Sequence, residues 1–206
     1  MKALILVDLQ NDFMPGGALP VPDGDAVVPV ANALSPLFSL VVATQDWHPR
    51  GHASFASSHP GKSPGDVVLL GDTEQVLWPD HCVQNTPGAS FYSGLDVVPI
   101  GHVVRKGADP RIDSYSAFFD NDRTSSTGLD AFLRSHGVSE VVVLGLATDY
   151  CVKFTVLDAL GLGFGVTVVR DGCRAVDVVP GDGERAFAAM EAGGARIVDA
   201  AAVPSL

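Results

Sequence analysis

The chain has 206 residues, of which 47% are hydrophobic, and its 24 acidic against 13 basic side chains give a formal net charge of -11. This length supplies one sizeable core, so we expect a single domain over residues 1–206. The negative charge argues against nucleic acid or an anionic membrane surface as a partner, because both attract proteins through lysine and arginine. A small-molecule ligand is the better expectation.

Short runs rich in Val, Ile and Leu recur along the chain and predict buried strands. Each run is continuously apolar, which is typical of strands covered on both faces in a parallel sheet. The runs cover residues 3–9, 39–46, 102–107, 140–146, 165–172 and 195–200. Between them, the pattern predicts crossover helices over about 24–38, 127–136, 149–162 and 181–193. We therefore expect a three-layer α/β/α fold with a mostly parallel sheet of about six strands.

Residues 47–101 do not follow this pattern. They are rich in Pro, Gly, His and Ser and contain few periodic segments. A loop region of this length inside a compact domain is usually functional. We therefore expect part of the site to come from it.

The sequence predicts a cytoplasmic protein. The apolar start "ALILV" stops at Asp8 without a cleavage site for a signal peptide. No segment approaches the roughly 18 to 20 apolar residues of a membrane span. Three cysteines, an odd number, favour reduced thiols over a disulfide framework.

Polar side chains stand where the predicted strands end. In open parallel sheets, ligands bind beyond the carboxyl ends of the strands. The residues at or just past these ends are Asp8, Asp46, His48, Lys106, Cys151 and Asp171. An acid, a base, a thiol and a pair of metal-ligand types are thus predicted to meet at one edge.

Cys151 is the candidate nucleophile. It is expected in the first turn of a helix with Thr148 or Asp149 as N-cap, where the helix dipole favours a thiolate. The alternative is a small buried hydrophobe, because free cysteine is among the most buried residue types.

Asp8 and Lys106 each end an apolar strand, where an unpaired charge is costly. An ion pair between them would remove this cost and place a proton acceptor and a cation beside Cys151. A purely structural ion pair is the alternative.

Asp46 and His48 lie two residues apart, so in extended backbone their side chains project to the same side. A third ligand could come from His81, His52 or His59. One carboxylate with imidazoles suits zinc, iron or manganese. The alternative is a set of polar loop residues with surface histidines.

Five motifs, in order, resemble the nicotinamidases of the isochorismatase-like cysteine hydrolases. They are "LILVDLQNDFMPGGALPV", "TQDWHPRGHASF", "LWPDHCVQNTPGASF", "RKGADPRIDSYSAFFDN" and "GLATDYCVKFTVLDA". The resemblance spans almost the whole chain. It implies deamidation of nicotinamide to nicotinate and ammonia through a thioester, which would feed NAD synthesis, with pyrazinamide as a close analogue.

The resemblance also implies roles for individual residues. Asp8, Lys106 and Cys151 match the catalytic triad, and Leu146 and Ala147 match the position of a cis peptide. The backbone N–H groups of Ala147 and Cys151 match the oxyanion hole. The metal ligands implied are Asp46, His48 and His81, with one divalent ion, zinc ahead of iron or manganese, and His52 left out of the set. The substrate-contacting residues implied are Phe13, Trp78, Tyr115 and Leu146.

The sequence leaves two other functions open. The first is a related amidase acting on an N-carbamoyl or ureide substrate. The second is a catalytically silent binding protein on the same fold. The sequence also leaves open whether the chain forms a homo-oligomer.

Overall fold

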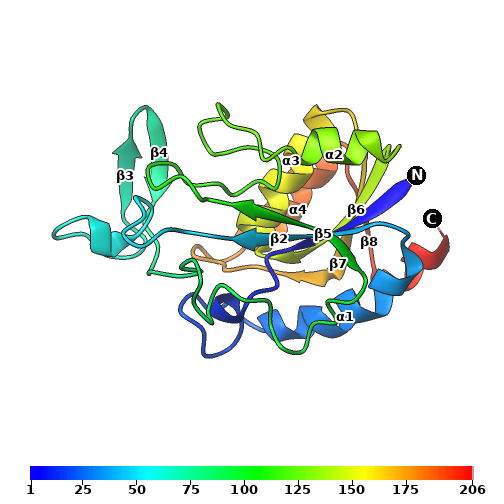
Figure 1. The fold of residues 1–206 in the computed structure, drawn as a ribbon, viewed down its shortest axis with the longest axis horizontal. Coiled ribbons are helices and arrows are strands. Elements are labelled where there is room, and N and C mark those ends of the chain that lie inside the picture. Colours follow the sequence, from blue (N-terminus) through cyan, green and yellow to red (C-terminus); the bar gives the residue numbers. More distant parts are fainter. Residues whose placement is uncertain (206) are drawn as a thin grey trace.

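A six-stranded parallel sheet forms the centre of the computed structural model, which describes residues 1–205 (Figure 1). The strand order is β5-β2-β1-β6-β7-β8, and every neighbouring pair runs parallel. The strands are β1 (Lys2–Val7), β2 (Val41–Asp46), β5 (Ile100–Lys106), β6 (Glu140–Leu146), β7 (Gly165–Arg174) and β8 (Arg196–Val198). All six predicted strands are confirmed.

Helices cover both faces of the sheet, which confirms the predicted three layers. In Figure 1, α1 lies on one side of the sheet and the other three helices lie on the opposite side. The helices are α1 (Val27–Leu34), α2 (Leu129–Ser135), α3 (Lys153–Gly161) and α4 (Asp182–Ala192). Short 3-10 turns at Gly24–Ala26 and Ser35–Leu37 extend α1 to nearly the predicted 24–38.

The core lies along the central strands. Residues Ala3 to Val7 of β1 are fully buried, since β1 has a strand on each side and helices on both faces. This double cover explains the continuous apolar run in the sequence. Within residues 1–205, no helix is long and apolar enough to cross a membrane.

The long segment between β2 and β5 contains a hairpin that the sequence analysis did not predict. It pairs β3 (Val67–Leu70) with β4 (Thr73–Val76) in antiparallel fashion. Figure 1 shows this hairpin apart from the main sheet, beyond the carboxyl ends of its strands. The rest of the segment is mostly irregular, as predicted.

Candidate active site and metal centre

The carboxyl ends of four neighbouring strands bring the predicted catalytic side chains together. Asp8 directly follows β1, and Asp46 and Lys106 are the last residues of β2 and β5, paired at the same level. Cys151 lies in a π-helical turn, Thr148–Val152, that begins two residues after β6. The expectation for Asp171 is wrong, because β7 continues past it and its exposed carboxylate accepts a hydrogen bond from the Ala200 N–H.

Lys106 joins these groups. Its Nζ lies 2.9 Å from Asp8 Oδ2, 2.7 Å from Asp46 Oδ1 and 3.4 Å from Cys151 Sγ. It also donates a hydrogen bond to the Ser114 carbonyl. Burial opposes the charge, but the two carboxylates outweigh it and hold the pKa of Lys106 well above its ordinary value. The ammonium is therefore a fixed positive charge in a buried site.

Asp8 is held in an uncommon backbone conformation. Its φ of 50° lies in the left-handed region, which costs a non-glycine residue about 1–3 kcal/mol. Its Oδ1 accepts a hydrogen bond from Thr44 Oγ1, whereas Oδ2 forms an ion pair with Lys106. Burial raises the pKa of Asp8 despite the opposing effect of Lys106. Oδ2 is thus a carboxylate oxygen able to accept a proton.

The predicted helix cap at Cys151 is wrong. Neither Thr148 nor Asp149 caps a helix, because the chain makes a π-helical turn there and Asp149 accepts hydrogen bonds from the backbone N–H groups of Val176 and Asp177. Burial raises the pKa of the Cys151 thiol well above its ordinary value, although Lys106 lowers it. The thiol is therefore protonated at rest, and it needs a base beside it.

The backbone before the nucleophile has the form that the resemblance implied. The peptide bond between Leu146 and Ala147 is cis. The Ala147 carbonyl accepts hydrogen bonds from the N–H groups of Tyr150 and Val152. These bonds fix the turn that carries Cys151.

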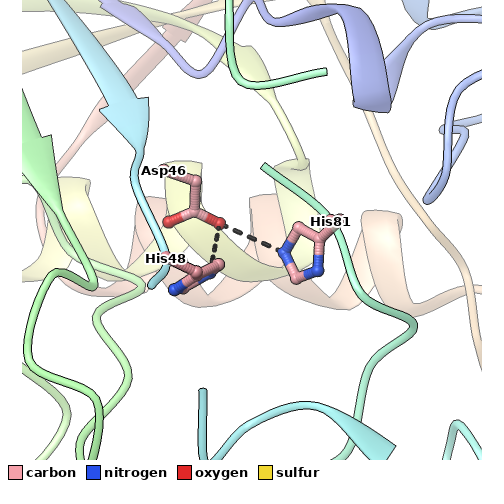
Figure 2. Close-up of side chains that lie close together, drawn as sticks. All are labelled: Asp46, His48 and His81. Carbon is pink, nitrogen blue, oxygen red and sulfur yellow. Dashed lines mark hydrogen bonds and ion pairs between the residues drawn. The ribbon is translucent and has the colours of Figure 1, made fainter. Parts of the chain in front are cut away.

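Asp46, His48 and His81 form a cluster suited to a metal ion (Figure 2). One ligand atom from each lies within 4.8 Å of the other two. The Nε2 atoms of His48 and His81 are 3.2 and 3.3 Å from Asp46 Oδ2. All three side chains are buried.

Contacts at Nδ1 of the two imidazole rings leave Nε2 as the nitrogen that can bind a metal. His48 Nδ1 contacts the Gly107 carbonyl at 2.9 Å, and His81 Nδ1 contacts the Pro79 carbonyl at 2.8 Å. Because a carbonyl only accepts, each Nδ1 carries a proton, and Nε2, which faces the Asp46 carboxylate, is the nitrogen of each ring that a metal would use. The donor set fits a divalent metal ion.

His52 and His59 are engaged elsewhere. His52 Nδ1 accepts a hydrogen bond from the Ser54 N–H, and its Nε2 lies 2.8 Å from the Asp109 carbonyl. His59 Nε2 contacts the Ala53 carbonyl. Both arrangements agree with His81 as the third ligand.

These contacts predict different results for two histidine substitutions. His48→Gln should lower zinc affinity by at least 10- to 100-fold, since it removes a ligand nitrogen, whereas His52→Gln should keep stoichiometric binding. Zinc content after dialysis against a weak chelator measures both. Loss of zinc from His52→Gln and not from His48→Gln would contradict the assignment.

Of the four residues implied for substrate contact, Phe13 packs against the metal cluster, and Trp78 and Tyr115 contact each other. Trp78 Nε1 donates a hydrogen bond to Tyr115 Oη at 3.1 Å, and the Phe13 ring lies 5.6 Å from the His81 ring. Leu146 is buried in the core. Tyr150, for which the sequence had indicated no role, packs its ring edge-on against Trp78 at 4.8 Å.

Two further residues that support the site were also missed. Gln10 accepts a hydrogen bond from the Asp46 N–H and donates one to the Asp46 carbonyl, which fixes that residue from both sides. Thr44 holds Asp8. Both are fully buried polar side chains in or just after apolar runs, and this placement was the available signal.

Comparison with known proteins identifies the family. The model of the isochorismatase domain matches residues 2–202. The chain belongs to the isochorismatase family. A nicotinamidase of Escherichia coli K12 is 54% identical over 200 residues, covering 95% of this chain and 93% of that protein.

Solved structures of this family superpose closely. The Acinetobacter baumanii nicotinamidase/pyrazinamidase has a TM-score of 0.95 at 44% identity, covering 98% of this chain and 97% of that one. A pyrazinamidase of Pyrococcus horikoshii in complex with zinc has a TM-score of 0.80 at 41% identity, covering 96% and 98%. The isochorismatase fold is therefore common to all three proteins.

Proposed function

We propose that this chain is a metal-containing cysteine amidohydrolase that converts nicotinamide to nicotinate and ammonia. The single observation that carries the proposal is the buried Lys106 ammonium in contact with Asp8, Asp46 and Cys151. The relatives named as nicotinamidases support the substrate. Pyrazinamide is proposed as a second substrate.

The first step generates the nucleophile. Asp8 Oδ2 takes the proton of the Cys151 thiol, and the sulfur attacks the amide carbonyl carbon to form a C–S bond. Lys106 stabilises the thiolate as it forms, since its Nζ is in contact with Sγ. A base is required here because burial keeps the thiol protonated.

The carbonyl oxygen becomes an oxyanion in this step. The backbone N–H groups of Ala147 and Cys151 are proposed to donate hydrogen bonds to it. Asp8 then gives its proton to the amide nitrogen, the C–N bond breaks, and ammonia leaves. A thioester to Cys151 remains.

Water completes the reaction. Asp8 takes a proton from a water molecule, which attacks the thioester carbon. The C–S bond breaks, and Asp8 passes this proton to the Cys151 thiolate. Nicotinic acid is released and the resting site is restored.

Asp46, His48 and His81 are proposed to hold one divalent ion, with zinc as the first choice and iron or manganese as alternatives. When bound, the ion would supply a Lewis acid that anchors the pyridine nitrogen and orders water. Asp46 also contacts Lys106 through Oδ1, so the same carboxylate belongs to both the metal centre and the triad.

Phe13, Trp78, Tyr115 and Leu146 are proposed to enclose the substrate ring. Residues 1–206 are proposed to form one domain. We also propose that the protein acts in NAD salvage, in the cytoplasmic location that the sequence predicts.

Ammonia release from a panel of amides tests this proposal. The metal-replete protein should hydrolyse nicotinamide and pyrazinamide with catalytic efficiency in the usual range of about 10⁴–10⁸ M⁻¹s⁻¹. N-carbamoyl and ureide amides should react far more slowly. A preference for those amides over nicotinamide would favour the related amidase instead.

A further inference from the structure

The hairpin that stands outside the main sheet is anchored by a polar side chain. Residues 67–70 and 73–76 are all described, and among them Gln75 alone is buried, at 2% exposure. Burying a carboxamide is unfavourable unless it is hydrogen-bonded. Two-stranded hairpins are also marginally stable alone. The contacts of Gln75 therefore determine the position of this hairpin against the rest of the protein.

Gln75 contacts the loop that follows β5. Its Nε2 lies 3.0 Å from Asp113 Oδ2 and 3.0 Å from Tyr115 Oη, and it donates to the Val76 carbonyl at 2.7 Å. Two of these partners, the carboxylate and the carbonyl, only accept, which fixes the orientation of the carboxamide. Asn121 Nδ2 approaches the Gln75 Oε1 at 3.4 Å, and Asn121 Oδ1 accepts from the Tyr115 N–H.

The Tyr115 hydroxyl is shared between Gln75 and Trp78. The indole N–H of Trp78 and the NH₂ group of Gln75 can only donate, so the Tyr115 oxygen is the acceptor in both contacts. The NH₂ group has two hydrogens for three acceptors, so one hydrogen is shared between two acceptors. Trp78 follows Gln75 by three residues in the chain. One carboxamide thus fixes the two aromatic rings relative to each other and to the loop at Asp113.

We propose that Gln75 is a positioning residue that holds Tyr115 and Trp78 in the wall around the substrate ring and so sets how tightly that ring is bound. The inference rests on the proposed function, because it assumes that these two rings face the substrate. Gln75 itself acts through the Tyr115 hydroxyl. The hydrogen bonds of its amide explain why a polar residue occupies the buried position of the hairpin.

Steady-state kinetics of Gln75→Met test this role. Methionine keeps the length of the side chain and removes its donors. We expect KM for nicotinamide to rise about tenfold while kcat changes less than about threefold. This is the pattern expected when a mutation weakens binding of the substrate and of the transition state equally. Glu74→Met, at the exposed neighbouring position, is the matched control and should leave both constants unchanged.

A double-mutant cycle separates positioning from general weakening of the hairpin. Tyr115→Phe removes the shared oxygen, and in this background Gln75→Met should raise KM by less than about twofold, since its partner is already gone. If the two substitutions act independently, so that their factors in KM multiply in the double variant, the inference would be overturned. An unchanged KM in Gln75→Met while the parent hydrolyses nicotinamide normally would also overturn it.

Fluorescence supplies a readout that does not depend on the substrate. The chain has two tryptophans, and Trp47→Phe leaves Trp78 as the remaining emitter. In this background, Gln75→Met should shift the Trp78 emission and Glu74→Met should not. Failure of the parent to hydrolyse nicotinamide would refute the proposed function alone, whereas an unshifted emission would refute the positioning role.

Discussion

Cys151→Ala is expected to lower the rate of ammonia release from nicotinamide by on the order of 10⁴-fold or more. In the proposed mechanism the thiol forms the thioester, and alanine leaves Asp8 and Lys106 without a nucleophile beside them. The variant should fold, because the change removes one atom from a small buried side chain and costs only about 1 kcal/mol of unfolding free energy. Initial rates with nicotinamide and urea unfolding curves measure the two quantities.

Cys173→Ala is the matched control. Cys173 is also buried, at 4% exposure against 7% for Cys151, but it lies within β7 and takes no part in the triad. It should keep nearly full activity while losing a similar amount of stability. Equal ammonia release by Cys151→Ala and the parent would remove the thiol from the mechanism and leave water as the attacking group.

The sequence predicted the sheet well because its strands are buried on both faces. A continuous run such as Ala3–Val7 has few other stable placements, and the strand ends then place Asp8, Asp46 and Lys106 at one edge. The juxtaposition of an acid, a base and a thiol followed from topology alone. Their individual roles came from the resemblance to a known family.

The hairpin and the turn at Cys151 were harder to predict because neither follows from hydrophobic periodicity. The pair Gly71-Asp72 between two short runs is a hairpin signal, but the hairpin is anchored by the hydrogen bonds of Gln75, which no periodicity reveals. The turn at Thr148–Val152 departs from an ordinary capped helix because Asp149 bonds a distant loop. The thiolate was likewise expected from local chain position, whereas tertiary burial raises the pKa of the thiol.

Lys106→Met is expected to lower activity about as strongly as Cys151→Ala does and to lower stability more. The substitution leaves Asp8 and Asp46 buried without the cation between them. Breaking a buried ion pair by removing one partner costs about 3–5 kcal/mol of unfolding free energy. Activity should fall by at least about 10³-fold, since the group that stabilises the thiolate is lost.

Lys62→Met is the control for loss of a lysine charge. Lys62 is exposed, and its replacement should change neither the free energy of unfolding nor the rate by a measurable amount. A Lys106→Met protein as stable and active as the Lys62→Met protein would show that the central ammonium is dispensable.

The loss of stability in Lys106→Met should depend on pH in a direction that the site determines. In the parent, burial and Asp46 raise the pKa of Asp8 while Lys106 lowers it, so removal of the cation raises this pKa further. A carboxyl whose pKa is higher in the folded than in the unfolded state binds more protons when folded, and its contribution to stability is lost as pH rises through the folded pKa. The deficit relative to the parent should therefore be smaller at mildly acidic than at mildly alkaline pH. Urea unfolding of both proteins across that range measures this, and a deficit that grows on acidification would contradict the arrangement of charges around Lys106.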